Sequence, residues 1–416
     1  MAKLSEVLKE RGYVYQFSST KLAEITDGPK RTVYLGVDPS ADSFHVGHLQ
    51  AMLVLRRFLE DGHNVILLIG GGTGMIGDPS GKSEERNLLD EQALETNTRG
   101  LEAQAKKLFN GLEFVLLDNG EWLKSLELIP FLRDIGKHFS VNAMLQRDSV
   151  KDRLEREGEG ISYTEFSYML LQSFDFLHLH EKYACDVQIG ASDQWGNIAS
   201  GIELIRRKTG NVVFGVTSPL LVNKSTGKKF GKSEQGAVWL DPEKTSPFAF
   251  YQFWLNAEDE SVEEYLLKMT TLLKAEIDAV MIMQKRNPKE RHAQRLLARA
   301  VTSLVHGEEA AEIAERVSQI LFGDASIDEL DKKGLEMLRS AAPNYPVENG
   351  APILDVLVES NMAESKREAR KFLADSAVTI NGVVASENDG ISEENFKNGI
   401  AVLKRGKRNV CVLTIS

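Results

Sequence analysis

Four short apolar runs alternate with helix-like stretches in the first half of the chain, and this alternation limits the possible folds more than any other feature. The runs cover residues 32–37, 64–69, 112–117 and 185–189. Each has the length and composition of a buried strand. Strands separated by helices form a parallel sheet with right-handed crossovers, and ligands of such sheets bind at the carboxyl ends of the strands. We therefore predict an α/β fold built on a Rossmann-like parallel sheet.

The first of these runs is followed by a motif with two histidines, His45-Val46-Gly47-His48. An amphipathic stretch, residues 49–59, comes next, so the motif lies where a strand passes into a helix. The start of a helix presents unpaired backbone N–H groups to anions. Histidines three positions apart lie on one side of the first turn, where neutral imidazoles can donate hydrogen bonds to phosphate or ribose oxygens. The glycine between them permits close approach of a ligand.

A second motif, Lys229-Phe230-Gly231-Lys232-Ser233, lies far downstream. It places two ammonium groups on a loop interrupted by glycine. Such groups can move onto a polyphosphate and stabilise charge that develops only in the transition state. Neither motif is informative by itself, but the two together predict a site for a nucleoside triphosphate.

Length and composition limit the class of protein. With 416 residues the chain is too long for a single ordinary core, and two or three domains are expected. A hydrophobic content of 42% and a charged content of 27% are typical of a soluble globular protein. No apolar run is long enough to span a bilayer and the first residues do not form a secretory signal, so a cytoplasmic location is expected. Because the only cysteines are Cys185 and Cys411, neither a disulfide framework nor a cysteine-rich zinc site is expected.

The second half of the chain changes character twice. Residues 246–322 are rich in Leu, Ala, Glu, Lys and Arg and predict a helical domain. The turn-prone, acidic stretch 323–350 predicts a linker. Residues 351–416 begin with helical patterns and end with strands, including a hairpin at residues 378–384 around an Asn-Gly turn.

Basic residues are clustered in this last segment, although the whole chain has a net charge of −11. Residues 351–416 carry nine Lys or Arg and nine Asp or Glu, so the segment is neutral. Such clusters are usually solvated faces, but two of them in one small domain favour contact with phosphate groups. The two clusters are Lys366, Arg367, Arg370 and Lys371, and Lys404, Arg405, Lys407 and Arg408.

A polar stripe lies along an otherwise apolar helix that we predict over residues 161–175. Tyr168, Gln172 and Asp175 are spaced i, i+4 and i+7, so they project from one side of the helix. Polar groups among apolar neighbours are costly unless they meet polar partners. From this segment alone, a ligand pocket and the solvated face of an ordinary helix remain equally open.

Two apparent nucleotide motifs fail on their context. Residues 72–77 fit the GxGxxG pattern and follow a strand, but Asp78-Pro79-Ser80-Gly81 comes next, where a dinucleotide-binding fold requires a helix. Gly81-Lys82-Ser83 resembles the end of a P-loop, yet the glycine needed five residues earlier is Ile76. We therefore expect neither a nicotinamide enzyme nor a P-loop enzyme.

The histidine and lysine motifs resemble the HIGH and KMSKS sequences of class I aminoacyl-tRNA synthetases, and the surrounding residues resemble bacterial tyrosyl-tRNA synthetases along essentially the whole chain. Val46 stands where HIGH has isoleucine, and Phe230-Gly231 stands where KMSKS has methionine and serine. The histidine and lysine positions are intact. The segment from Ser365 to Gly382 resembles the small RNA-binding fold first known from a ribosomal small-subunit protein.

This resemblance implies a domain order and a reaction. Residues 1–245 would form the catalytic domain, 246–322 a helical domain on the anticodon side of the tRNA, 323–350 a linker and 351–416 an RNA-binding domain. L-tyrosine would attack the α-phosphate of ATP, expel pyrophosphate and then pass as an acyl group to the 3′ end of tRNA(Tyr). Mg²⁺ would accompany ATP without a dedicated metal site. A symmetric homodimer is also implied, with residues 136–150 as a candidate interface.

The resemblance also assigns roles to individual residues. Tyr34 and Asp175 would bind the phenol of tyrosine, Asp78, Tyr168 and Gln172 its ammonium group, and Gln194 would lie near its carboxylate. The expected ATP-binding residues are Gly36, Asp38, Ser40, His45, Gly47, His48, Gly190, Asp193, Lys229, Lys232 and Ser233. His45, His48, Lys229 and Lys232 are the candidate catalytic residues. The two basic clusters would contact tRNA.

Three alternative functions stay open at this point. A tryptophanyl-tRNA synthetase shares the architecture, although its substrate lacks the hydroxyl that Tyr34 and Asp175 would recognise. A small-molecule nucleotidyltransferase with an HxGH motif would need neither the helical domain nor the basic C-terminal segment. Loss of His48 or Lys232 would favour a non-catalytic RNA-binding protein with a vestigial synthetase fold, and both residues are present.

Overall fold

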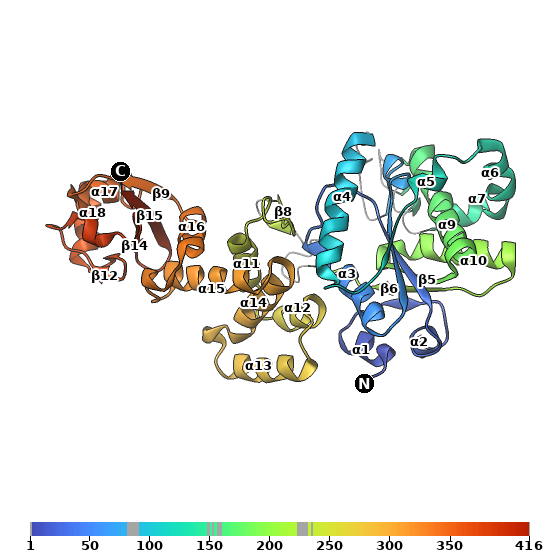
Figure 1. Ribbon diagram of the computed structural model, residues 1–416, viewed down its shortest axis with the longest axis horizontal. Helices are drawn as coiled ribbons and strands as arrows, with labels where there is room; N and C mark the ends of the chain where they lie inside the picture. Colours follow the sequence, from blue (N-terminus) through green and yellow to red (C-terminus); the bar gives the residue numbers. More distant parts are fainter. Residues whose placement is uncertain are drawn as a thin grey trace. The chain divides into compact units, whose positions relative to one another are not determined.

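The computed structural model describes residues 2–80, 91–147, 150–151, 154–155, 160–222, 232–233 and 236–415, with only the backbone of residues 232–233. The chain divides into two compact units (Figure 1). The first contains Met1–Lys244 and Glu258–Ile282, and the second contains Thr245–Ala257 and Met283–Ser416. Among the described residues, no helix has both the length and the apolar character needed to cross a membrane.

The first unit is built on a six-stranded sheet with the strand order β1-β6-β5-β2-β3-β4. Strands β2 to β6 are parallel to their neighbours, and β1 is antiparallel to β6. The predicted parallel α/β fold is therefore confirmed. The strands are β1 (Gln16–Phe17), β2 (Thr32–Val37), β3 (Asn64–Ile69), β4 (Val115–Asp118), β5 (Cys185–Ala191) and β6 (Phe214–Ser218).

Two predicted strands match the structure at both ends, and two do not. The runs 32–37 and 64–69 are β2 and β3. The run 185–189 begins where β5 begins, but β5 continues to Ala191. The run 112–117 was expected to form a strand throughout, but β4 begins only at Val115. Asn110 and Gly111 both have positive φ, and the N–H of Leu112 closes this turn on the carbonyl of Phe109 at 3.1 Å. Leu112 is apolar, but it lies at the end of a turn and not at the start of a strand.

Helices cover both faces of this sheet (Figure 1). The side chains of Tyr34, Ile66 and Leu68 form one core with residues of α9 and α10. Helix α3 connects β2 to β3 and contacts both strands. Right-handed crossovers that run in opposite directions along a sheet place their helices on opposite faces of it. The described helices of this unit are α1 (Leu4–Glu10), α2 (Leu22–Thr26), α3 (Val46–Glu60), α4 (Glu91–Leu108), α5 (Gly120–Leu123), α6 (Leu128–Asp134), α7 (Val141–Leu145), α9 (Tyr163–Tyr183), α10 (Trp195–Thr209) and α12 (Val262–Met269). Helix α13 (Lys274–Arg286) contains residues of both units.

The direction of the chain reverses between β2 and β5. From β2 the chain continues to β3 and β4 on one side, and it then returns to β5 and β6 on the other side of β2. The loops after β2 and β5 therefore diverge and leave a crevice at the carboxyl edge of the sheet. This is where the fold provides room for a ligand.

The GxGxxG pattern does not form a dinucleotide-binding turn. Residues Thr73–Met75 form a short 3₁₀ helix, and Gly77 then takes a positive φ of 86°. No described helix starts directly after this turn, because residues 78–80 are not helical and the next described helix is α4. The apparent P-loop end, residues 81–83, lies outside the described residues.

The second unit combines a helical layer with a small five-stranded sheet. The sheet has the order β12-β11-β14-β15-β9, and β10 (Ala351–Pro352) pairs separately with β13 (Gly390–Ile391). The Asn381–Gly382 turn joins β11 to β12 with positive φ at both residues, 48° and 84°, so the predicted hairpin is confirmed. The elements are α11 (Pro247–Leu255), α14 (His292–His306), α15 (Glu308–Phe322), α16 (Lys332–Ala341), α17 (Ile353–Glu359), α18 (Lys366–Ala374), β9 (Asn344–Val347), β11 (Val378–Ile380), β12 (Val383–Val384), β14 (Ile400–Arg405) and β15 (Asn409–Ile415).

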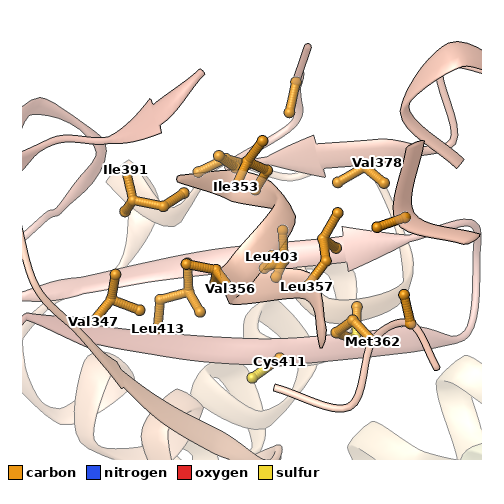
Figure 2. Close-up of a cluster of buried hydrophobic side chains, with 14 of the residues drawn as sticks. Val347, Ile353, Val356, Leu357, Met362, Val378, Ile391, Leu403, Cys411 and Leu413 are labelled. Carbon is orange, nitrogen blue, oxygen red and sulfur yellow. The ribbon is translucent and has the colours of Figure 1, made fainter. Parts of the chain in front are cut away.

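The five-stranded sheet is apolar on both faces. On one face, residues such as Leu403 and Leu413 pack against Val356 and Leu357 of α17 (Figure 2). On the other face, Ile400, Val402 and Val412 join a second cluster with residues of α15 and α16. Apolar side chains on successive positions of β14 thus serve two different cores.

The stretch 323–350, whose composition predicts a linker, contains helix α16 and strand β9. Leu335 and Leu338 of α16 are buried in the cluster on the second face of the sheet, and β9 pairs in parallel with β15. Of the turn-forming residues that suggested a linker, Gly323, Pro343 and Gly350 lie outside these elements, whereas Pro346 lies within β9. The spacing of three residues between these two leucines indicates a helix, but the turn-prone composition of the whole stretch obscured this pattern.

Candidate active site

A cavity of about 590 Å³ lies at the carboxyl ends of the parallel strands of the first unit. Its wall includes residues that follow β2, β3, β4, β5 and β6. The predicted site residues that line it are Tyr34, Gly36, Asp38, Ser40, His45, Gly47, His48, Asp78, Tyr168, Gln172, Asp175, Gly190, Asp193 and Gln194. Lys229 lies outside the described residues, as do the side chains of Lys232 and Ser233.

One end of the cavity holds a buried hydroxyl close to a buried carboxylate. The Tyr34 side chain is 1% exposed, and its hydroxyl has no hydrogen-bond partner among the described residues. Burial and the nearby Asp175 raise the pKa of Tyr34 well above its ordinary value. Burial likewise raises the pKa of Asp175 to about 7. A buried hydroxyl without a partner costs free energy unless a ligand supplies one, so this end of the cavity is suited to a polar group on an otherwise apolar ligand.

The carboxylate of Asp175 is held by two donors from the start of helix α5, far away in the sequence. Asn119 Nδ2 donates to Asp175 Oδ2 at 2.8 Å, and Trp122 Nε1 donates to Asp175 Oδ1 at 2.8 Å. Asn119 Oδ1 in turn accepts a hydrogen bond from the backbone N–H of Gly72 at 2.8 Å. These bonds fix the orientation of the carboxylate and connect it to the glycine-rich loop after β3.

A chain of amide side chains lies near the second carboxylate of the cavity. Gln194 Nε2 donates to Asp78 Oδ2 at 2.6 Å, and Gln172 Nε2 donates to Gln194 Oε1 at 3.3 Å. Asn197 Nδ2 donates to Gln172 Oε1 at 2.9 Å. The predicted residues Asp78, Gln172 and Gln194 therefore form one network, although they come from three separate segments.

A third carboxylate, Asp38, lies between the two groups described above. The Tyr168 hydroxyl donates to Asp38 Oδ2 at 3.0 Å, and Thr73 Oγ1 donates to Asp38 Oδ1 at 2.8 Å. A side chain at Gly70 could not be accommodated, because a Cβ atom there would lie 2.2 Å from Asp38 Oδ1. The glycine-rich loop is thus needed for close packing against Asp38 and not for a phosphate-binding turn.

The histidine motif begins helix α3, and its hydrogen bonds define both imidazole rings. His45 is the N-cap residue, and its Nδ1 accepts a hydrogen bond from the backbone N–H of Gly47 at 3.0 Å. The Nδ1 of His48 accepts one from the backbone N–H of His45 at 3.2 Å. Since both Nδ1 atoms are acceptors, each neutral ring carries its proton on Nε2. The pair therefore offers two N–H donors, which suits phosphate or hydroxyl oxygens.

The segment that follows the lysine motif lies against the histidine motif. The backbone N–H of Val46 donates to the carbonyl of Val238 at 2.9 Å, and that of Leu240 donates to the carbonyl of Phe44 at 2.9 Å. His45 and Trp239 are paired across this short antiparallel bridge. The two motifs, distant in sequence, are therefore joined through the residues directly after the second one.

Several residues that hold this site together were not among the predicted ones, namely Thr73, Asn119, Trp122, Asn197 and Trp239. Asn119 directly follows β4, and a polar residue at the carboxyl end of a parallel strand was an available signal. The indole N–H of Trp122 needs a partner when buried, which was a weaker signal. No pattern in the sequence indicated that residues 236–240 pair with the histidine motif.

The two predicted basic clusters are neighbours in the second unit. Arg405 of β14 lies over the ring of Phe372 of α18, with its guanidinium carbon 4.6 Å from the ring centroid. The ammonium group of Lys404 donates to the carbonyl of Gly323 at 2.7 Å, so one of its hydrogen bonds is made within the protein. Arg370 pairs with Glu387 at 2.7 Å. Among the described residues, no group of three or more His, Cys, Asp or Glu side chains is arranged to hold a metal ion.

Comparison with known protein families agrees with this fold and cavity. Residues 26–323 match the family described as tRNA synthetases class I (W and Y). Residues 335–413 match the family described as the tyrosine–tRNA ligase SYY-like C-terminal domain. The fold and the site thus define a class I tRNA synthetase of the tryptophan and tyrosine group.

Individual relatives identify the family to which the chain belongs within this class. The chain is 43% identical over 421 aligned residues to tyrosine–tRNA ligase 1 of Vibrio parahaemolyticus, covering 99% of this chain and 98% of the relative. It is 47% identical over 419 residues to the tyrosine–tRNA ligase of Staphylococcus saprophyticus, with 97% of each chain covered. A solved C-terminally truncated mitochondrial tyrosyl-tRNA synthetase of Aspergillus nidulans has 32% identity and a TM-score of 0.67 over 76% of this chain and 92% of its own. The chain belongs to the tyrosine–tRNA ligases.

Proposed function

We propose that this protein activates L-tyrosine with ATP and transfers it to the 3′ end of tRNA(Tyr). The tyrosine carboxylate attacks the α-phosphate of ATP in line, and pyrophosphate leaves. The resulting tyrosyl-adenylate then gives its acyl group to the terminal ribose of the tRNA and releases AMP. The protein needs no covalent nucleophile for either step, because positioning and charge stabilisation lower the barrier.

The observation that carries this proposal is that Tyr34 and Asp175 line the same cavity as His45 and His48. A tyrosine phenol can donate to the Asp175 carboxylate and accept from the Tyr34 hydroxyl, which has no partner among the described residues. An indole can donate a hydrogen bond but cannot accept one, so the O–H of Tyr34 would find no acceptor on it. The cavity therefore favours tyrosine over tryptophan within the class.

The remaining polar groups of the cavity are assigned to the other parts of the two substrates. The ammonium group of tyrosine is placed among Asp78, Tyr168 and Gln172, which already share hydrogen bonds with neighbouring residues. Gln194 is assigned to the carboxylate.

On the nucleotide side, the Nε2–H groups of His45 and His48 are assigned to phosphate and ribose oxygens respectively. Ser40 is assigned to the phosphates, and Gly190 and Asp193 to the ribose. Gly36, Asp38 and Gly47 form the wall beside them. Lys229, Lys232 and Ser233 are assigned to the pyrophosphate, on the motif alone. Mg²⁺ enters as part of the ATP substrate and neutralises phosphate charge when bound.

The tRNA is assigned to the two basic clusters of the second unit. Arg367 and Lys371 on α18 and Lys407 and Arg408 in the turn after β14 are exposed. Their positive charge suits the phosphate backbone of RNA, and releasing counterions from that backbone favours binding. Translation takes place in the cytoplasm, which is the compartment that we propose for the protein.

A homodimer is proposed as the working assembly. The region of residues 136–150 and the preceding helix α6 carry exposed apolar side chains, among them Leu128 (67% exposed), Ile129 (71%) and Val141 (57%). Large apolar side chains gathered on one surface are typical of an interface. Sedimentation of the purified protein at micromolar concentration tests the assembly, and a monomer under these conditions would refute it.

The reaction is tested by the exchange of labelled pyrophosphate into ATP. We expect exchange that depends on tyrosine, with tryptophan and phenylalanine giving little or none. Aminoacylation of tRNA(Tyr) is measured in parallel. Exchange supported by tryptophan would identify the other enzyme of the class, and exchange that needs no amino acid would indicate a different nucleotidyltransferase.

A further inference from the structure

We infer that Trp239 is a positioning residue for adenylate formation, because it holds the imidazole of His45 in the orientation that directs Nε2–H towards the nucleotide. The inference rests on the proposed role of His45 at the phosphates. It concerns a residue outside both motifs, and it explains why the segment after the lysine motif is paired with the helix start.

The backbone places the two side chains together. Residues 44–46 and 238–240 form a short antiparallel bridge with two hydrogen bonds of 2.9 Å. In an antiparallel pair, directly opposed residues project their side chains to the same side. His45 and Trp239 are directly opposed, and their ring centroids lie 5.9 Å apart in an edge-to-face arrangement of 68°.

Two further contacts of His45 favour one orientation of its ring. The imidazole of His48 lies at a centroid distance of 4.0 Å and an angle of 33°, and Nδ1 of His45 accepts from the N–H of Gly47. A ring rotated by half a turn would lose that hydrogen bond and present a carbon in place of Nε2–H. Trp239 borders the ring as well, so removing its indole gives the imidazole room to rotate.

Trp239 itself is fixed from outside. The ammonium group of Lys244 lies 5.0 Å from the centroid of the indole, and it forms an ion pair with Asp42. Val238 and Leu240, on either side of Trp239, are 4% and 3% exposed and anchor the segment in the core. The side chains of Asp42, Lys244, Trp239 and His45 therefore form a continuous series that begins and ends near the start of α3.

The first test compares Trp239→Ala with Trp239→Phe in the full-length protein. We expect Trp239→Ala to lower kcat for tyrosine-dependent pyrophosphate exchange by about 10- to 100-fold, because misplacing a catalytic group by ~1 Å costs on the order of 100-fold. Tyrosine affinity by calorimetry should stay within about twofold, since the phenol end of the cavity does not include Trp239. Trp239→Phe keeps an aromatic edge and should restore most of the rate. A rate in Trp239→Ala equal to that of the unchanged protein would overturn the inference.

A matched control separates positioning from general damage to the segment. Val238→Ala removes a buried side chain next to Trp239 in the same bridged segment. It should lower the melting temperature at least as much as Trp239→Ala while leaving the exchange rate within about twofold. If Val238→Ala slowed exchange as much as Trp239→Ala, the effect would belong to the segment and the inference would fail.

A double-mutant cycle with His45→Ala decides whether Trp239 acts through His45. If it does, adding Trp239→Ala to His45→Ala should cause little further loss, because the group that it positions is already absent. Additive losses would overturn the inference. A His45→Ala variant as fast as the unchanged protein would remove its premise, and absence of tyrosine-dependent exchange in the unchanged protein would instead refute the proposed function.

Discussion

The active-site cavity and the C-terminal sheet place their polar groups in opposite ways. In the cavity, Asp175 is 2% exposed and Tyr168 is 6% exposed, and both take part in hydrogen bonds between side chains. In the C-terminal sheet, the interior of β14 and β15 is apolar on both faces, and the basic side chains lie at the surface. One region buries its polar groups, and the other exposes them.

The size and charge of the two proposed ligands account for this difference. An amino acid can be enclosed, so buried polar groups can recognise it by the cost of leaving them unpaired. A tRNA cannot be enclosed, and its repeated phosphates are bound best by exposed cations on a rigid support. Specificity for tyrosine should therefore be sensitive to single buried atoms, whereas affinity for tRNA should be shared among several surface residues.

The largest expected effect is that of Asp175→Ala on tyrosine. This change removes the carboxylate that accepts from the phenol, and a hydrogen bond to a charged group contributes ~1.5–3 kcal/mol, which amounts to about 100-fold at the upper end. It also leaves the donors of Asn119 and Trp122 without their partner. We expect kcat/KM for tyrosine in pyrophosphate exchange to fall by about 100-fold, with the KM for ATP nearly unchanged.

Asp186→Asn is a matched control for this change. Asp186 lies on β5, pairs with Arg31 at 3.3 Å and does not line the cavity. Its replacement should alter kcat/KM for tyrosine by less than about twofold. Unchanged tyrosine affinity of Asp175→Ala in calorimetry would mean that the phenol is recognised elsewhere.

A smaller effect is expected when two cations of α18 are removed together. The double substitution Arg367→Ala and Lys371→Ala should lower kcat/KM for tRNA by about 10-fold and leave pyrophosphate exchange unchanged. Each lost phosphate contact reduces the slope of log affinity against log salt by about one. Filter binding at several salt concentrations measures that slope. An unaltered slope would show that these side chains do not touch the RNA backbone.

The control for the cation pair is Lys332→Ala with Lys333→Ala, which removes the same charge from exposed positions of α16. Deletion of residues 351–416 should also abolish aminoacylation and spare exchange. Ile400, Val402 and Val412, however, share a core with α15 and α16, so the deletion would expose apolar surface. The surface substitutions are therefore the sharper test.

The two regions also differed in how far the sequence predicted them. Strands β2 and β3 were predicted to the residue, because continuous apolar runs are bounded there by polar or glycine residues. The stripe of Tyr168, Gln172 and Asp175 was recognisable because helix periodicity alone places these residues on one side. In the second unit, the Asn-Gly hairpin was predicted, but α16 was hidden by the turn-forming residues around it.

The supporting residues of the cavity could not be predicted, since their partners are remote in sequence. Asn119 is separated from Asp175 by 56 positions, and local periodicity carries no information about such a contact. The pairing of Trp239 with His45 is of the same kind. Positions that face a ligand carried a local pattern, whereas positions that orient those residues became visible only with the fold.

The smallest effect expected is a pH dependence that belongs to the cavity alone. Burial raises the pKa of Asp175 to about 7, so the carboxylate is ionised above this pH and increasingly protonated below it. In the proposed binding mode the phenol O–H donates a hydrogen bond to the ionised carboxylate, and tyrosine binding therefore requires that Asp175 lose its own proton. Between pH 7 and pH 6 the dissociation constant for tyrosine should rise about fivefold, while above pH 8 it should be flat.

Calorimetry in buffers of different ionisation enthalpy checks the sign, because tyrosine binding below pH 7 should release a proton. Asp175→Asn cannot titrate, so its weaker binding should lose the pH dependence between pH 6 and pH 7. A dependence that survived in Asp175→Asn would have to come from another group. The affinity for tRNA provides the contrast, because the proposed contacts of α18 with RNA do not involve Asp175 and should not follow the protonation of that carboxyl group. A shared pH profile for both ligands would mean that the two regions are coupled, and the separation between buried and exposed recognition would no longer hold.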